Sequence, residues 1–347
     1  MSQKYGVAII GCGKISQTRH IPEYLANPNT EILGYYDWNQ ERAEEMAEKF
    51  GGTAYATVDE LLANPVIQLV SVCVANAEHA SITIKALNAG KHVLCEKPMG
   101  TSLAECQEMV DTANAHHLNL MIDQNQRLAK AHVRAKQLIE SDIIGKVLTF
   151  KTTFGHGGPE TWSIDAGAST WFFDKNNSKF GAIFDLGVHK IDIIQYILND
   201  PIKKVMAKLT TLDKQNSEGQ LIEVDDNAMG IYQTENGVLG SVTASWTYYG
   251  EEDNTTFIYG TDGIMKIYDD PTYSIQVIKR NGEKINYEID QIQTNDNQTS
   301  SGIIDEFVAS IMENRLSISD AESVLHSMKV TFASAESSDQ NKEIIID

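Results

Sequence analysis

The first 125 residues alternate short apolar runs with helix-like stretches, and this alternation constrains the fold more than any other feature of the chain. The apolar runs are rich in β-branched residues and show little polar alternation, as expected for strands buried on both faces. Repeated strand and helix in this order predict a doubly wound parallel sheet in an α/β protein. The predicted strands are residues 5–10, 31–37, 69–75, 92–96 and 118–123, with helices expected over 39–51 and 57–65.

The pattern changes after residue 140 to longer runs separated by turn signals. Glu-Asn-Gly at 235–237, Thr-Asp-Gly at 261–263 and Arg-Asn-Gly at 280–282 are typical of antiparallel hairpins. We therefore expect two domains: residues 1–125, and an α+β domain over 126–347 built on one mostly antiparallel sheet. Its helices are expected near 187–198, 301–313 and 319–335.

Length and charge exclude several classes of function. A chain of 347 residues suits two domains. Its formal charge of −20 would repel nucleic-acid phosphates and anionic membrane surfaces, so we expect neither as a partner. The apolar run at the start is too short for a signal peptide, and no later segment is long enough to span a bilayer, so a cytoplasmic location is expected. Four cysteines without C-x-x-C spacing predict buried free thiols and no metal site.

A glycine turn directly after the first predicted strand indicates a dinucleotide site. In "GVAIIGCGKIS" the first glycine allows the tight turn, the second lets the backbone approach the pyrophosphate, and the following helix N-terminus offers N–H groups. Ser16 stands where a glycine or alanine is usual, and its hydroxyl needs a partner. The alternative is a simple turn with a solvent-facing acid after the second strand. We expect cofactor contacts from Gly11, Gly13, Lys14, Ile15 and Asp37.

Asp37 also bears on the choice of cofactor. A carboxylate at the end of the second strand can accept hydrogen bonds from ribose hydroxyls and would repel a 2′-phosphate, which favours NAD over NADP. Arg42 is the counter-argument, because a guanidinium that reached back could hold that phosphate.

Two further segments carry groups suited to redox chemistry on alcohols. "VLCEKPMG" places Lys97 at the carboxyl end of a later strand, the edge of such sheets where ligands bind; its alternative is a surface lysine in a turn. In "FGAIFDLGVHKID", Asp185 and His189 are four apart, so a helix would present both on one face; either alone is more often a core residue. Oxidation of an alcohol needs a group that removes the hydroxyl proton and partners that orient it.

The segments "GCGKIS", "HASITIKALNAGKHVLCEKP" and "FGAIFDLGVHKID" together resemble the glucose-fructose oxidoreductase and inositol dehydrogenase family, also called Gfo/Idh/MocA. The resemblance covers nearly the whole chain. It implies an N-terminal Rossmann domain, a C-terminal domain with an open-faced sheet, and NAD(P)-dependent redox chemistry on sugars, cyclitols or related compounds. It implies that Lys97, Asp185 and His189 form the catalytic group, with Glu96, Asn76 and His79 around the nicotinamide.

Substrate contacts are expected from polar and aromatic residues outside these motifs. A polyhydroxylated ring is commonly held by an aromatic face and several hydrogen-bonding groups. The alternatives are surface polar residues at a linker and tryptophans of the core. The candidates are Asn125, Arg127, His156, Trp162 and Trp171.

Two other functional classes stay open. A cofactor-binding regulator would keep the Rossmann fold without catalysis, and a redox-assisted glycosidase or lyase would retain its nicotinamide and release a cleaved sugar. A broad open sheet face also predicts a homo-oligomer, because a second copy is its simplest cover.

Overall fold

The structure is a computed structural model that describes residues 4–291 and 300–347; the predicted domains also include residues 1–3 and 292–299, which lie outside the described part. The chain divides into two compact units. Of the described residues, unit 1 holds 4–125, 176–178 and 300–325, and unit 2 holds the rest.

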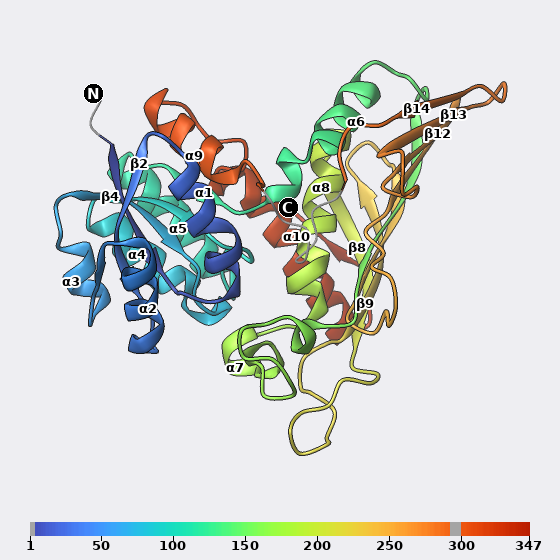
Figure 1. Cartoon of the computed structure of the whole chain (residues 1–347). Helices are drawn as coiled ribbons and strands as arrows, with labels where there is room; N and C mark the ends of the chain where they lie inside the picture. Colours follow the sequence, from blue (N-terminus) through green and yellow to red (C-terminus); the bar gives the residue numbers. More distant parts are fainter. Residues whose placement is uncertain (1–3, 292–299) are drawn as a thin grey trace. The chain divides into compact units, whose positions relative to one another are not determined.

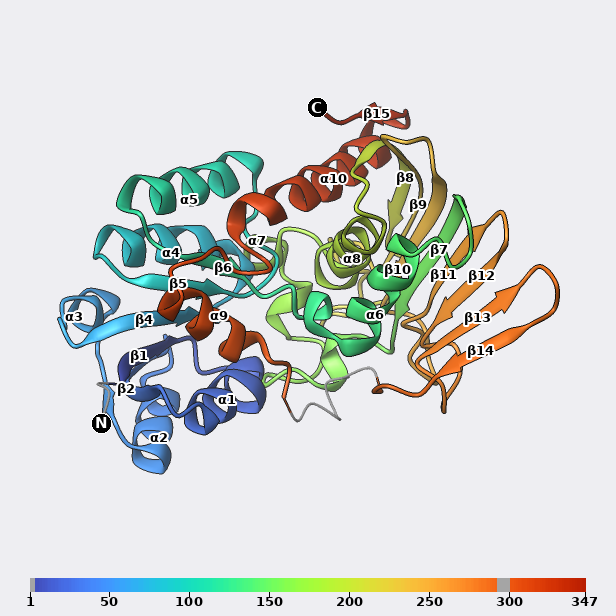
Figure 2. The same cartoon turned by 90° about the horizontal axis from the view of Figure 1, so that it is seen from above.

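Unit 1 is the predicted doubly wound parallel sheet, in the order β3-β2-β1-β4-β5-β6. Every strand pair in it is parallel. Figure 2 shows helices on both of its faces, with α4 and α5 on one and α1 and α9 on the other. The strands are β1 (Tyr5–Ile10), β2 (Thr30–Tyr36), β3 (Thr53–Ala54), β4 (Ile67–Val72), β5 (His92–Cys95) and β6 (Leu120–Ile122); the helices are α1 (Ile21–Ala26), α2 (Gln40–Phe50), α3 (Val58–Leu62), α4 (His79–Asn88), α5 (Leu103–His116) and α9 (Ile303–Met312).

Local sequence explains where two of these helices begin. Asn39 caps α2 by accepting the Glu41 N–H at 3.2 Å, and Thr57 caps α3 by accepting the Glu60 N–H at 3.1 Å. The four cysteines are buried and free, as predicted. The strand order reverses between β1 and β4, so the turns after these strands meet at the edge where doubly wound sheets bind ligands.

Unit 2 is built on the predicted, mostly antiparallel sheet, in the order β14-β13-β12-β11-β7-β10-β9-β8-β15. The three predicted turns join β9 to β10, β11 to β12 and β13 to β14 as antiparallel hairpins, whereas β7 and β10 pair in parallel. Figure 1 shows α6 and α8 beside this sheet. The strands are β7 (Val147–Gly155), β8 (Ile202–Thr210), β9 (Asn227–Thr234), β10 (Leu239–Ser245), β11 (Thr256–Gly260), β12 (Gly263–Ile267), β13 (Ile275–Lys279), β14 (Lys284–Tyr287) and β15 (Ile344–Ile345); the helices are α6 (Lys130–Glu140), α7 (Lys175–Ser178), α8 (Val188–Leu198) and α10 (Ala321–Gln340), of which 176–178 and 321–325 belong to unit 1.

The two faces of the unit 2 sheet differ in burial. The helix-covered face carries one buried row across neighbouring strands, formed by Val205, Tyr232, Phe150, Ile258, Met265 and Val277. Figure 2 shows none of the described helices of unit 2 on the opposite face. Five apolar side chains on this opposite face, here termed the outer patch, are 47% to 69% exposed: Met206, Met229, Ile231, Leu239 and Ile345.

Candidate active site

The turn after β1 is built so that glycine is required at its first position. Gly11 has a φ of 95°, and a Cβ there would lie 2.4 Å from the Cys73 carbonyl oxygen. A Cβ built on Gly13 meets nothing within 4 Å, which leaves room for a ligand to approach the backbone. The Ser16 hydroxyl donates to the Gly13 carbonyl at 2.8 Å. Lys14 and Ile15 open the helix that follows. These features fit the pyrophosphate of a dinucleotide.

Asp37 lies beside this turn, directly after β2. Its Oδ2 accepts the Cys12 N–H at 2.6 Å and its Oδ1 accepts the Asn39 N–H at 2.9 Å. Each carboxylate oxygen has a second lone pair, so the buried group can also accept from ribose hydroxyls. The Arg42 guanidinium carbon lies 5.8 Å from the ring centroid of Trp38, an exposed tryptophan, in a cation–π contact.

Glu96 and Lys97 follow β5 at the same edge of the sheet. The Lys97 N–H donates to Glu96 Oε2 at 3.2 Å. Next to them, the ring of His79 bridges two main-chain oxygens, with Nδ1 2.6 Å from the Pro98 oxygen and Nε2 3.0 Å from the Val74 oxygen. Burial lowers the pKa of His79, although both carbonyls oppose the shift. A neutral imidazole has one N–H, so His79 donates to one of these two oxygens, either in the Lys97–Pro98 segment or at the end of β4.

The other two candidates in unit 1 are amide side chains. Asn76 is buried and donates to the Ser178 carbonyl at 3.0 Å, within the same unit. Asn125 follows β6, and its buried Oδ1 accepts no hydrogen bond from the described residues.

The Asp185 and His189 segment of unit 2 is helical, as predicted. A π-helical turn (Ile183–Gly187) leads directly into α8. Asp225 holds its start by accepting the N–H groups of Gly181 and Ile183, each at 2.8 Å. A Cβ on Gly181 would lie 1.8 Å from the Asp225 carbonyl oxygen, so only glycine fits there. Burial raises the pKa of the Asp225 carboxyl to about 6.

Asp185 and His189 each have an aromatic neighbour in unit 2. The Trp246 indole N–H donates to Asp185 Oδ2 at 3.0 Å. The His189 ring centroid lies 6.1 Å from that of Phe154. Both candidates are buried, with 6% and 7% of their surface exposed.

Three predicted substrate residues join the same aromatic group. His156 lies 5.9 Å from Phe154 and 6.3 Å from Trp162, measured between ring centroids. Phe172 contacts Trp162 at 5.2 Å and stacks on Trp171 at 3.9 Å. The fold thus gathers His156, Trp162 and Trp171 with His189 in one continuous aromatic set.

Arg127 is placed differently from these three. Its guanidinium makes a bidentate ion pair with Asp192, with Nε and Nη2 donating at 2.8 and 2.7 Å. Both side chains are buried. This pairing favours a structural role for Arg127 over substrate binding.

Several contributors have no signal in the sequence. Trp246 is 61 residues from Asp185 in the chain, and Asp225 is 44 from Gly181. In unit 1, Arg19, His20 and Asp123 are buried next to Glu96. No motif marks any of these residues, since their roles depend on the folded arrangement.

Among the described residues, the ligand atoms of His20, Glu96 and Asp123 lie within 4.8 Å of one another, as a metal site would require. The Arg19 guanidinium lies 3.1 Å from Asp123 and 3.9 Å from Glu96, so a protein cation already compensates these carboxylates. A metal ion there would be repelled by it. We assign the group to hydrogen bonding.

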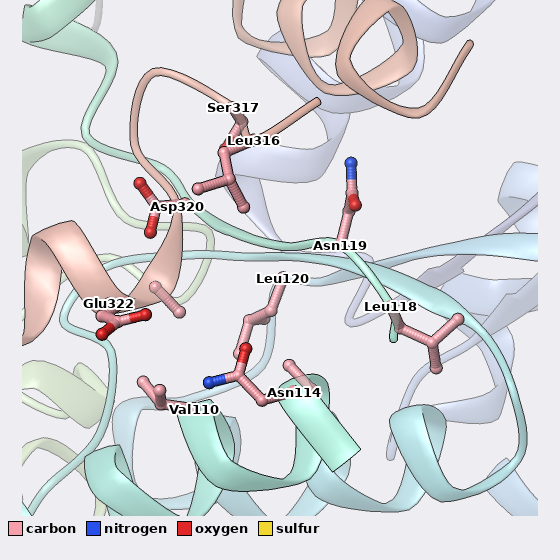
Figure 3. Close-up of a pocket in the computed structure, with 11 residues that line it drawn as sticks. Val110, Asn114, Leu118, Asn119, Leu120, Leu316, Ser317, Asp320 and Glu322 are labelled. Carbon is pink, nitrogen blue, oxygen red and sulfur yellow. The ribbon is translucent and has the colours of Figure 1, made fainter. Parts of the chain in front are cut away.

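A separate hollow in unit 1 lies between α5, the start of β6 and residues 316–322 (Figure 3). It is lined by Val110, Asn114, Leu118, Asn119, Leu316 and Asp320 among others. None of the predicted site residues lines it. No described helix has the length and apolar character that crossing a bilayer requires.

Comparison with known proteins places these features in context. Residues 5–124 match the model of an oxidoreductase family with an NAD-binding Rossmann fold, and residues 132–266 match the GFO/IDH/MocA C-terminal domain. Glucose-6-phosphate 3-dehydrogenase of Bacillus subtilis is 33% identical over 243 residues, which cover 69% of this chain and 67% of that protein. Levoglucosan dehydrogenase of Pseudarthrobacter phenanthrenivorans is 32% identical, covering 65% of this chain and 62% of that one. A solved structure of levoglucosan dehydrogenase in complex with NADH and L-sorbose is 25% identical, covers 99% of both chains and gives a TM-score of 0.87.

Proposed function

Because this chain belongs to the Gfo/Idh/MocA family of oxidoreductases, we propose that it oxidises a hydroxyl group of a sugar, cyclitol or related polyol with NAD as the acceptor. The observation that carries this proposal is the glycine turn after β1 with the Asp37 carboxylate held against it. A bound nicotinamide would supply the acceptor for the hydride that leaves the carbon. The proposed contacts of the whole NAD molecule are Gly11, Gly13, Lys14, Ile15, Asp37, Asn76, His79, Glu96 and Lys97. NAD is proposed over NADP because Asp37 would repel a 2′-phosphate and Arg42 already contacts Trp38.

Three residues are proposed to assist removal of the hydroxyl proton. His189 accepts it, since imidazole is the usual base near neutral pH. Lys97 donates a hydrogen bond to the reacting oxygen, because an ammonium has three hydrogens and no lone pair. Asp185, oriented by Trp246, polarises the pair. A neutral Lys97 acting as the base is the alternative assignment, because lysine titration shifts readily in a dry site.

Each of the two predicted domains is proposed to supply one part of this chemistry. Residues 1–125 would bind the cofactor, and residues 126–347 would bind substrate and associate with other copies. The aromatic set with His156, Trp162 and Trp171 offers ring faces and a polar edge for a polyhydroxylated substrate. Asn125 is also proposed to contact the substrate, because its buried Oδ1 accepts no hydrogen bond from the described residues.

We also propose a homo-oligomer and a cytoplasmic location. The outer patch supports the oligomer, because the solvated face of an antiparallel sheet is ordinarily polar. A second copy would bury these side chains.

A substrate panel with NAD tests the function. Glucose 6-phosphate, levoglucosan, glucose and myo-inositol are offered in turn, and NADH is followed by absorbance. Sustained NADH formation with one of them is expected, and Lys97→Ala should lower its rate roughly 100-fold while NAD binding is kept. Sugar cleavage without NADH accumulation would instead indicate the redox-assisted glycosidase or lyase, and NAD binding without either reaction would indicate the regulator.

A further inference from the structure

Four charged side chains are buried together next to the Glu96–Lys97 segment of unit 1. His20 and Asp123 are 0% exposed, and Arg19 and Glu96 are 7% and 5% exposed. Arg19 Nη1 lies 3.1 Å from Asp123 Oδ2, and His20 Nε2 lies 3.0 Å from Glu96 Oε1 and 3.5 Å from Asp123 Oδ2. Burying charges in this way is costly unless each one is paired, so each member constrains the position of the others.

His20 connects this group to the backbone of Lys97. On one side, its Nδ1 lies 3.1 Å from the Ser71 hydroxyl, which in turn lies 2.9 Å from the Tyr24 hydroxyl. On the other side, its Nε2 contacts Glu96 Oε1 while Glu96 Oε2 accepts the Lys97 N–H at 3.2 Å. Tyr24 and Ser71 are fully buried, so this end of the series lies inside the protein.

The charges in this group balance when His20 is protonated. Burial alone would lower the pKa of His20, but the Cys73 sulfur, Asp123 and Glu96 raise it well above its usual value. Burial would raise the pKa of Asp123, whereas Arg19 and His20 lower it overall. Two cations then face two carboxylates, and Glu96 is held by a charged donor, the stronger kind of hydrogen bond.

We propose that His20 is a positioning residue, which fixes the Glu96 carboxylate and through it the backbone from which Lys97 projects toward the substrate. The proposal rests on the proposed function, in which Lys97 contacts the reacting oxygen. Without His20, Glu96 loses the cationic donor at 3.0 Å, whereas the Arg19 guanidinium lies farther away at 3.9 Å, so the carboxylate can rotate. Lys97 would then lose its fixed backbone hydrogen bond, and turnover would fall because catalysis depends on precise placement of the donor.

A double-mutant cycle between His20 and Lys97 tests this proposal, with the compound from the panel that gives the highest rate. His20→Ala is expected to lower kcat 10-fold or more, with KM and the Kd for NADH changed less than threefold. In the Lys97→Ala background the same change should lower kcat less than twofold, because there is no lysine left to position. His20→Gln, whose amide can donate to Glu96 without the charge, should recover part of the lost kcat.

A matched control separates positioning from general damage to the fold. His132→Gln alters another fully buried histidine, which lies in unit 2 and contacts the Gln126 carbonyl, and it should leave kcat within twofold. Equal losses from His20→Ala with and without Lys97 would overturn the proposal, as would normal kcat in His20→Ala. If His20→Ala does not fold, the same cycle is run with His20→Gln. Failure of the proposed function can be told apart from failure of the His20 proposal, because in the former case Lys97→Ala would keep full turnover.

Discussion

The indole N–H of Trp246 donates to Asp185 Oδ2 at 3.0 Å, and both side chains are buried in unit 2. This bond fixes the carboxylate proposed to polarise the catalytic pair. Trp246→Phe keeps most of the ring and removes the donor, so we expect kcat to fall about 10-fold, in line with loss of a hydrogen bond to a charged group. Steady-state kinetics check this. Tyr232→Phe, which removes a buried hydroxyl bonded to Ser334 in the same unit, should leave kcat unchanged; an equal loss in both variants would contradict the assignment.

His189→Ala should lower turnover roughly 100-fold, the usual scale for losing a general base. The wild-type rate should fall in acid, because a protonated imidazole cannot accept the hydroxyl proton. The variant should lose this acidic limb of its pH–rate profile. His326→Gln, outside the candidate site and bonded to the Ile202 carbonyl, should retain it. An acidic limb that persists in His189→Ala would assign the base to another group.

NAD should bind at least 10-fold more tightly than NADP. Asp37→Asn removes the charge that would repel a 2′-phosphate while keeping a similar shape, so we expect weaker NAD binding and tighter NADP binding. Fluorescence titration with NADH and NADPH measures both constants. Wild-type protein that binds the two equally would shift attention to Arg42.

Ile231→Asp should abolish self-association, because it places a charge in the centre of the outer patch beside Met206. Sedimentation velocity over a wide concentration range checks the assembly state. Leu316→Asp is the control, since Leu316 is 73% exposed but belongs to unit 1. A wild-type monomer at all concentrations would refute the oligomer.

Lys190 should make stability depend on pH. It is fully buried on α8, its Nζ donates to the Asn254 carbonyl at 3.0 Å, and burial lowers its pKa to about 7, with Asp253 and Glu252 opposing. A lysine in the unfolded chain titrates near 10.4, so between about pH 7 and that value the unfolded state binds more protons and stability rises with pH.

The variant Lys190→Met lacks this dependence. The free energy of unfolding of the wild type relative to the variant should therefore rise by about 2 kcal/mol from pH 7 to pH 9, since one proton contributes up to about 1.4 kcal/mol per pH unit. Neighbouring His132 does not add to it, because burial and Lys190 lower its pKa to about 3, well below this window. Urea denaturation at three pH values measures the difference, and parallel curves for the two proteins would show that Lys190 does not titrate there.

The parts of the fold that could be predicted from sequence are those set by local pattern. β1 and the cap at Thr57 each depend on residues that are close in the chain. β8 was not predicted, because Lys203, Lys204 and Lys208 give it a composition that is common in helices. Its strand conformation is decided by pairing with β9 on one side and β15 on the other.

The same limit applies to the candidate site. Asp185 and His189 could be selected because their spacing is helical, but the partner of Asp185 comes from the end of another strand. The arginine side chain of Arg127 is a type that often binds substrates, so the sequence made it a candidate. Its ion pair with Asp192 becomes visible only in the folded structure. The side chains that surround a predicted residue depend on long-range packing.

Neighbouring aspartates in unit 2 secure two different segments. Asp225 holds the start of the Asp185–His189 helix, whereas Asp226 accepts the N–H groups of residues 212–214. Lys214 from that segment bonds to Glu160 and to the Gly157 carbonyl, in the loop that carries Trp162. The loop that carries Trp162 can therefore be exchanged, to accept a different sugar, separately from the helix proposed for catalysis. Such an exchange should keep Lys214, Asp225 and Asp226, because these residues hold the neighbouring segments in place.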